Sequence, residues 1–252
     1  MPKQLTVSII VPVYNDAIAL ERCLAAIAEQ TVMPHEVIVV DNNSTDRTVA
    51  VAESYPFVKV LQEAKQGVVH ARNRGFDAAT GDIIGRLDAD SCVASDWVAT
   101  LQALFATGTL DAVSGSIRYH DIWLSPSLNV ADILIRKSLS VLMADEVSLQ
   151  GANMALGRSA WHAVRSSTCV AHGLHEDFDL AIHLRQLSYR NRFEPSLRCS
   201  TALRQATGTW LDFARYMMVC PATYFRHGRL KGAYITRCFT CHTFLPNVAR
   251  LI

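Results

Sequence analysis

Short apolar runs rich in β-branched residues alternate with amphipathic helical patterns through the first half of this 252-residue chain. A strand that is apolar at nearly every position is buried on both faces, which is typical of a parallel sheet covered by helices. Short connections between strand and helix predict the same architecture. The predicted strands lie at 5–13, 36–41, 57–62, 82–90 and 111–119, and the helices between them begin near residues 17, 46, 67 and 95. We therefore expect an α/β fold with a Rossmann-like, mostly parallel central sheet flanked by helices.

Single residues predict where two of these helices begin and end. Gly81 follows the helical pattern over 67–79 and is expected to close it as a C-cap. Ser95 is expected to cap the next helix, which runs to about Ala106. Beyond residue 120 the predicted elements are a helix at 127–144, a short strand at 149–156, a helix at 175–187 and a strand at 193–203.

The net charge of +1 conceals two parts of opposite sign. Residues 1–180 carry a net charge of −8, and residues 181–252 carry +9. This asymmetry indicates either an acidic catalytic or metal-binding part beside a basic part that faces an anionic partner, or two parts that attract each other across one fold. The basic part includes an aromatic and apolar segment at 209–231, which can lie on an anionic membrane or pack against the sheet. We expect a helical, amphipathic C-terminal extension over 204–252.

The chain shows no uncharged apolar stretch near the roughly 18–20 residues that cross a bilayer, and its N-terminus resembles a strand rather than a signal peptide. We therefore expect a cytoplasmic protein, with peripheral attachment to the inner face of the membrane as the alternative. Seven scattered cysteines do not predict a disulfide framework. Cys238, Cys241 and His242 match C-x-x-C-H, for which haem attachment, a zinc site and a coincidence of thiols are the three interpretations.

Polar and acidic side chains follow three of the predicted strands. Tyr14 and Asn15 come after the first, Asp41 ends the second, and Asp88 and Asp90 end the fourth. In parallel α/β sheets, ligands bind beyond the carboxyl ends of the strands. Carboxylates at i and i+2 of an extended segment point to one side, so Asp88 and Asp90 predict a site for Mg²⁺ or Mn²⁺. The alternative is that they are solvated acids that open the next helix.

Asp41 and Arg72 predict contacts to a nucleotide. The Asp41 carboxylate can accept a hydrogen bond from a planar base, or it can close an Asx-turn. Arg72, followed by Asn73, lies early on a predicted helix and can reach a diphosphate, or it can pair with an acid at the surface. The chain contains no G-x-G-x-x-G, G-x-x-x-x-G-K-[ST] or G-x-S-x-G sequence. This weakens the case for a dinucleotide oxidoreductase, a P-loop phosphotransferase or an α/β-hydrolase.

Six short motifs occur in an order that resembles the family two glycosyltransferases. They are VSIIVPVYND, VIVVDNNSTDRT, HARNRG, DAD, GANMA and HED, and they span roughly residues 5–200. Each is loose by itself, whereas the six in order are specific. The resemblance implies a GT-A fold over residues 1–203, with a nucleotide-binding half at about 1–119 and an acceptor half at about 120–203. It also implies an inverting transfer from a nucleotide-activated sugar.

The resemblance also implies roles for individual residues. Asp88 and Asp90 look like the metal–diphosphate motif, with Asp90 as the direct ligand of Mn²⁺ or Mg²⁺. Asp177 looks like the general base and Glu176 is its rival, while the alternative is that both are ordinary acids at a helix N-terminus. The residues that resemble nucleotide contacts are Pro12, Tyr14, Asn15, Asp41, Asn43, Arg72 and Asp88, and those that resemble the lining of the acceptor and donor-sugar site are Gly151, Ala152 and Asn153.

These assignments predict an inverting glycosyltransferase that adds a single sugar from a UDP- or GDP-linked donor to a glycan or lipid-linked acceptor, as in the biosynthesis of cell-envelope glycans. The Q-x-x-R-W motif and transmembrane bundle of the longer processive members are missing, which argues against a polysaccharide synthase. We expect no nucleic-acid partner. One alternative is a sugar nucleotidyltransferase, although PVYNDA lacks the Gly-rich loop that such an enzyme needs after its first strand. The other is a binding module that has kept the fold and lost catalysis.

Overall fold

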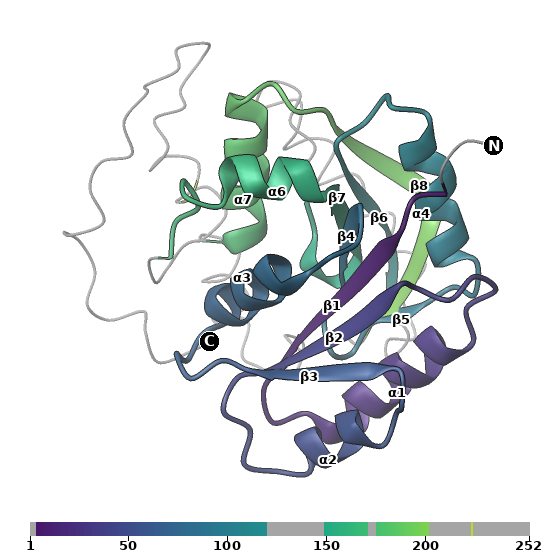
Figure 1. Cartoon of the computed structure of the whole chain (residues 1–252), viewed down its shortest axis with the longest axis vertical. Coiled ribbons are helices and arrows are strands. Elements are labelled where there is room, and N and C mark those ends of the chain that lie inside the picture. The colour runs from purple at the N-terminus through teal and green to yellow at the C-terminus, as the bar shows by residue number, and fades with distance from the viewer. Residues whose placement is uncertain (1–3, 120–148, 171–174, 202–222, 224–252) are drawn as a thin grey trace.

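One curved sheet of eight strands forms the centre of the protein, and helices cover both of its faces (Figure 1). The computed structural model describes residues 4–119, 149–170, 175–201 and 223. The strands are ordered β3 (Val58–Gln62), β2 (Glu36–Asp41), β1 (Val7–Val13), β4 (Ile83–Arg86), β7 (Met154–Gly157), β6 (Ala112–Tyr119), β8 (Asn191–Thr201) and β5 (Cys92–Val93). The predicted helix at 127–144, the extension over 204–252 apart from Thr223, and the C-x-x-C-H sequence lie outside the described residues.

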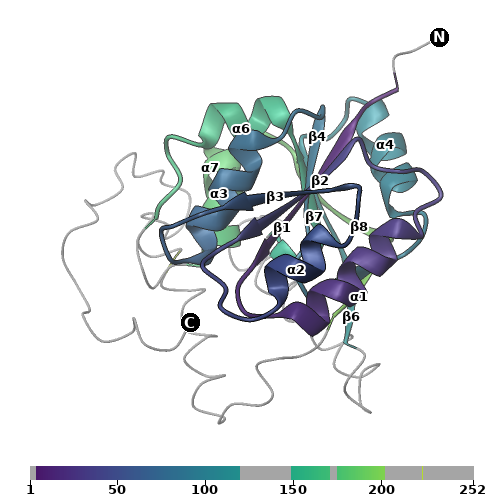
Figure 2. The same cartoon turned by 60° about the horizontal axis from the view of Figure 1, so that its bottom comes forward.

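Two clusters of buried side chains lie on opposite faces of the sheet. Along β1, Ile9 and Val11 belong to one cluster and Ile10 to the other, because successive strand side chains point to opposite faces. The first cluster packs against α1 (Ala17–Ala28), α2 (Thr48–Glu53) and α4 (Trp97–Ala106), and the second against α3 (Val68–Ala78), α6 (Arg158–Val164) and α7 (Glu176–Gln186) (Figure 2). In the described ranges, no helix has the length and apolarity that crossing a bilayer requires.

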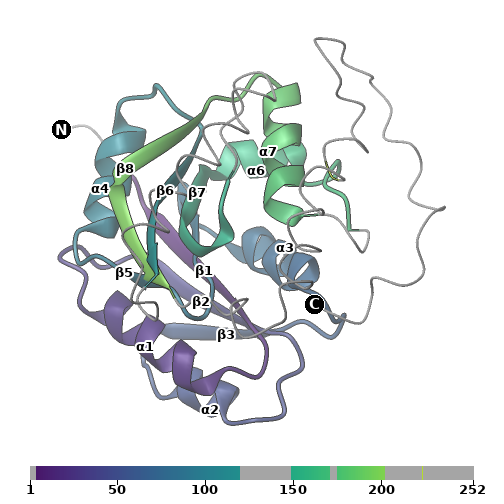
Figure 3. The same ribbon diagram turned by 180° about the vertical axis from the view of Figure 1, so that it is seen from behind.

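The first four strands run parallel, as predicted, so their carboxyl ends share one edge of the sheet. β7 then runs antiparallel to both β4 and β6, whereas β6 and β8 are parallel and β5 is antiparallel to β8 (Figure 3). Four of the seven strand pairings are therefore parallel. The strand predicted at 149–156 is shorter than expected, because Gly151–Asn153 form a 3-10 turn, η1, before β7 begins.

The two predicted helix caps are wrong. α3 ends at Ala78, and the extended backbone of Ala79 stops the helix without a glycine. A Cβ on Gly81 would lie 2.7 Å from Ser8 Oγ and 2.8 Å from the Ser8 backbone nitrogen. Gly81 is therefore needed for close packing of the chain against β1. The residue that precedes α4 is Asp96 rather than Ser95.

Candidate active site

The loops that follow β1 and β2 are tied together at the carboxyl edge of the sheet. The Asn15 backbone N–H donates to Ser44 Oγ at 2.9 Å, and Asn15 Oδ1 accepts from the Thr45 N–H at 2.7 Å. Asn15 has a positive φ of 48°, a conformation that Asn tolerates better than most residues. Next to this junction, 53% of Tyr14 is exposed, whereas Pro12 is buried within β1. The structure thus brings Tyr14 and Asn15 next to the turn after β2, as the strand ends predicted.

Asp41 closes the turn after β2. It is buried, and its two carboxylate oxygens accept from the Ser44 N–H at 3.2 and 3.3 Å. The sequence allowed two roles for Asp41, a turn contact or a contact with a nucleobase, and this hydrogen bond is the turn contact. The contact of Asp41 with a nucleobase stays a prediction. Asn43, with a φ of 69°, donates from its amide to the Ala64 carbonyl at 3.0 Å.

Asn42 organises this edge and was missed in the sequence. Its amide nitrogen donates to the carbonyls of Glu63 and Lys65, both at 2.8 Å, and its Oδ1 accepts from the Gly67 N–H at 2.7 Å. These bonds attach the segment between β3 and α3 to the end of β2. A buried Asn directly after a buried strand was the available signal, since a buried amide needs partners.

Arg86, the last residue of β4, lies at the centre of the candidate site and was also missed. Its side chain is only 2% exposed. Its Nη1 contacts Asp177 Oδ1, and its Nη2 lies 3.0 Å from Glu176 Oε1 and 3.1 Å from Asp88 Oδ1. The sequence feature that could have revealed Arg86 is an arginine in an otherwise apolar strand. A buried charge needs partners of opposite sign.

Mutual electrostatics shift the titration of this group. Burial by itself would lower the pKa of Arg86, but the carboxylates of Asp177, Asp88 and Glu176 outweigh it and the pKa rises. Burial would raise the pKa of Glu176, but Arg86, then His175 and Arg72, lower it to about 2. Burial raises the pKa of Asp88 to about 6 against the opposing effect of Arg86. The Asp88 side chain is still 43% exposed, so water screens part of this effect.

The start of α7 meets η1 and α3 at the same place. Asp177 is buried, and its Oδ2 accepts from the Gly151 N–H at 2.7 Å. Arg72 Nη1 donates to the Glu176 carbonyl at 3.0 Å, and its other guanidinium N–H groups bond to Asn73 Oδ1. Arg72 is fully buried, so it is not a surface arginine. Its contact with a diphosphate stays a prediction.

Asn153 holds three elements together. Its amide nitrogen donates to the carbonyls of Ser116 at 2.9 Å and Leu197 at 2.8 Å, and its Oδ1 accepts from Trp97 Nε1 at 2.8 Å. Both amide N–H groups therefore have partners in β6 and β8. Asn153 is fully buried, and its contact with a sugar stays a prediction. The contacts of Gly151 and Ala152 with the donor sugar or acceptor stay predictions.

Asp88 and Asp90 fit the predicted divalent metal. They lie between β4 and β5, where the Ser91 N–H donates to the Asp88 carbonyl at 2.9 Å and Ser91 Oγ donates to the Ala152 carbonyl at 2.8 Å. This loop is thus attached to η1. Both side chains are partly exposed at the carboxyl edge of the sheet, and carboxylate oxygens are the ligands that Mg²⁺ and Mn²⁺ prefer.

The family model for glycosyl transferase family 2 matches residues 8–125, which include β1 through β6 and the Asp88-Ala89-Asp90 loop. Residues 8–125 belong to glycosyl transferase family 2. The resemblance found in the sequence is thereby confirmed for this part of the chain.

Curated glycosyltransferases also match part of the chain. The uncharacterized glycosyltransferase YibD of Escherichia coli is 35% identical over 108 residues, which are 41% of this chain and 31% of that protein. The glycosyltransferase AglE of Haloferax volcanii is 33% identical over 120 residues, which are 45% of this chain and 40% of that protein. The chain thus matches less than half the length of these curated relatives.

Solved structures confirm the GT-A fold. The mannosyltransferase PcManGT from Pyrobaculum calidifontis, in complex with GDP-Man and Mn²⁺, is 26% identical with a TM-score of 0.70 over 90% of this chain and 66% of that chain. The glucosyl-3-phosphoglycerate synthase of Mycobacterium tuberculosis, solved with Mn²⁺ and UDP-glucose, is 20% identical with a TM-score of 0.60 over 86% of this chain and 80% of that chain. The second likeness shows the fold alone. The curved sheet and its helices therefore have the predicted architecture.

Proposed function

We propose that this chain is an inverting glycosyltransferase that moves one sugar from a UDP- or GDP-linked donor to an acceptor hydroxyl. The observation that carries the proposal is the convergence of Asp88 and Asp177 on one buried guanidinium, that of Arg86, within a family 2 fold. The binding of GDP-Man and Mn²⁺ by the mannosyltransferase at 26% identity supports a nucleotide-sugar donor.

Asp88 and Asp90 are the residues that would hold Mn²⁺ or Mg²⁺, with Asp90 as the direct ligand. When bound, such a cation would neutralise the negative charge that develops on the leaving diphosphate. Asp88 already shares Arg86, so its orientation is set by the protein before a donor binds. Preorganised charge of this kind needs little rearrangement during the reaction.

Asp177 is the proposed general base. In a single displacement, the acceptor hydroxyl attacks the anomeric carbon opposite the leaving nucleotide, and a carboxylate within hydrogen-bond reach takes the proton. Arg86 and the Gly151 N–H each occupy one oxygen of Asp177, and a carboxylate offers roughly four lone-pair sites, so further sites can accept. Glu176 is the rival base, since its Oε1 lies 3.0 Å from Nη2 of the same guanidinium.

The loops after β1 and β2 are the proposed nucleoside site. The exposed ring of Tyr14 offers a flat face for a base, and Asn15, Asp41 and Asn43 define the adjoining turn. Pro12 and Arg72 complete the proposed nucleotide contacts from β1 and α3. In this proposal residues 1–119 form the nucleotide-binding half and residues 120–203 the acceptor half.

The acceptor is proposed to be a glycan or a lipid-linked glycan of the cell envelope, approached near Gly151 and Ala152. The net charge of +9 over residues 181–252 supports an anionic surface as a partner, such as the inner face of a membrane. Flotation with anionic liposomes tests this part, and binding that does not weaken with salt would contradict it.

The activity test is incubation of the purified chain with a panel of UDP- and GDP-sugars, Mn²⁺ and simple acceptors. Release of nucleoside diphosphate, with an inverted anomeric configuration of the product by NMR, supports the proposal. A nucleotidyltransferase would instead release pyrophosphate from a nucleoside triphosphate and a sugar phosphate. Binding of a nucleotide-sugar without transfer or hydrolysis of any donor would favour the binding module.

A further inference from the structure

The Arg86 guanidinium joins two parts of the site that have different proposed roles. Through Nη1 it contacts Asp177, the proposed base. Its Nη2 lies 3.1 Å from Oδ1 of Asp88, which is on the side of the proposed sugar donor, and 3.0 Å from Oε1 of Glu176. One planar group therefore bridges the donor side and the base side of the proposed reaction.

Packing allows this guanidinium little freedom. β4 lies between β1 and β7, and the neighbours of Arg86 along the chain, Gly85 and Leu87, are buried. A Cβ on Gly151 would overlap the Arg86 Cζ, so the guanidinium lies directly against the η1 backbone. The same Gly151 donates its N–H to Asp177 Oδ2. Arg86 and Gly151 thus hold the two oxygens of Asp177 from two directions.

The charges around Arg86 make its position costly to change. Three carboxylates surround this one cation, so its removal would leave like charges facing each other in a largely buried site. Lysine could supply the charge at this position. It could not reproduce the planar arrangement of donors that serves Asp177 and two further acids at once.

We propose that Arg86 is the positioning residue of the reaction, which holds Asp177 in the orientation of a base while fixing Asp88 relative to it. The proposal rests on the glycosyltransferase function proposed above. Arg86 acts through these carboxylates and does not itself take a proton or contact the sugar. Its loss therefore affects turnover more strongly than donor binding.

The first test compares Arg86→Lys with the wild-type chain in kcat, in donor KM, and in Kd for UDP or GDP with Mn²⁺. We expect kcat to fall at least 100-fold while KM and Kd change less than about 5-fold, because the positive charge beside Asp88 is kept. The matched control is Arg165→Ala, which removes an exposed arginine that pairs with Asp77 and should leave kcat unchanged. A kcat for Arg86→Lys within 3-fold of wild type would overturn the proposal.

The second test is chemical rescue. Arg86→Ala leaves a space for a small planar cation. Millimolar guanidinium should therefore raise the kcat of this variant at least 10-fold, whereas ammonium at the same concentration should not. Equal rescue by both ions, or no rescue of a variant that melts like the wild type, would overturn the proposal. Should Arg86→Ala not fold, Arg86→Lys decides alone. Wild-type protein without transfer on any donor would defeat the proposed function, whereas active wild type with unimpaired Arg86→Lys would defeat only the positioning role.

Discussion

The two ends of the sheet both hold carboxylates, but in opposite environments. At the amino ends of the parallel strands, Glu36 Oε1 accepts from Ser8 Oγ at 2.7 Å and from the Thr80 N–H at 2.7 Å. Asp82 Oδ2 accepts from the Thr6 N–H at 3.0 Å and from the Thr6 hydroxyl at 2.8 Å. At the carboxyl ends, three acids instead gather around Arg86, with Asp90 close by.

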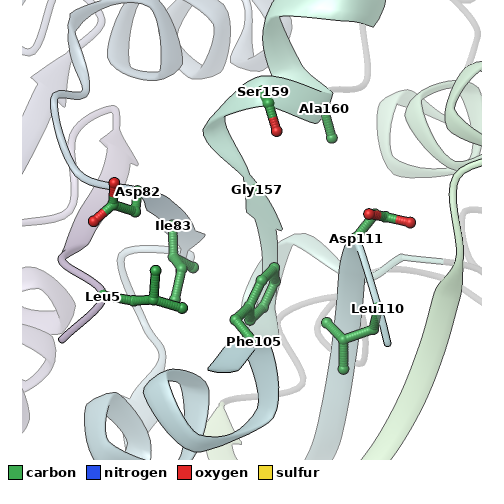
Figure 4. A pocket seen from close by; sticks show the side chains of 9 residues that line it. All are labelled: Leu5, Asp82, Ile83, Phe105, Leu110, Asp111, Gly157, Ser159 and Ala160. Carbon is green, nitrogen blue, oxygen red and sulfur yellow. The ribbon is translucent and has the colours of Figure 1, made fainter. Parts of the chain in front are cut away.

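This difference separates a folding role from a functional one. An acid bound by hydroxyls and backbone N–H groups joins neighbouring segments and needs no other charge. Acids that repel one another around one buried cation are a poor way to gain stability, so such a group points to function. A pocket also opens at the amino ends, between Leu5, Asp82, Phe105 and Asp111 (Figure 4). It lies at the edge opposite to the one where α/β sheets bind ligands.

The largest expected effect comes from Asp177→Asn at the carboxyl edge. Loss of the proposed base should lower kcat about 10³-fold, equivalent to roughly 4 kcal/mol in the barrier. Binding of UDP or GDP should persist, and initial-rate kinetics with calorimetry measure both. The matched amino-end variant, Asp82→Asn, should keep its kcat within about twofold. More than a tenth of wild-type activity in Asp177→Asn would remove Asp177 as the base.

Asp90→Ala tests the metal side of the same edge. With Mn²⁺ and nucleoside diphosphate at about 100 times Kd, the wild-type chain should gain about 2.7 kcal/mol of stability. This corresponds to a rise of about 5–10 °C in Tm, and Asp90→Ala should lose most of it. Asp111→Ala, at the amino edge, should keep the full rise. An undiminished Mn²⁺-dependent rise in Asp90→Ala would contradict the metal assignment.

Gly81→Ala tests the packing at the amino edge. The new Cβ would meet Ser8 at 2.7–2.8 Å, and we expect the free energy of unfolding to fall by about 2 kcal/mol with kcat unchanged. The control is Gly157→Ala, because a Cβ there would come no closer than 3.7 Å to its nearest neighbour. Denaturant unfolding measures both variants. Equal stability of the two would show that the chain relaxes around Gly81.

The smallest expected effect concerns Glu36. Burial tends to raise its pKa, but hydrogen bonds from Ser8 and Thr80 prevail and lower it. A carboxylate with a lowered pKa stabilises the fold above its ordinary pKa of about 4.5, and this contribution is lost as the pH falls through the folded value. Glu36→Gln should therefore lower the free energy of unfolding by about 1 kcal/mol at pH 7. The difference should shrink in unfolding experiments below pH 4. A difference that grows with acidification would reverse the assigned sign.

Much of this architecture could be predicted from local patterns. β-Branched runs produced β1, β2, β3 and β6 within two residues of their observed ends, and the acids of the first turn marked the start of α7. Because parallel strands align their carboxyl ends, the positions of Tyr14, Asp41 and Asp88 at one edge also followed. The order of six motifs was enough to indicate the family.

Other features depend on residues far apart in the chain. The sequence by itself determined which segments are strands and helices, since apolar periodicity is local and the hydrophobic effect acts on it directly. Only the tertiary structure decided that Arg86 meets Asp177, that Asn153 is held by β6, β8 and Trp97, and that Gly81 packs against Ser8. These contacts join residues 37 to 91 positions apart, and a buried polar group takes whichever partner the completed fold brings within hydrogen-bond distance.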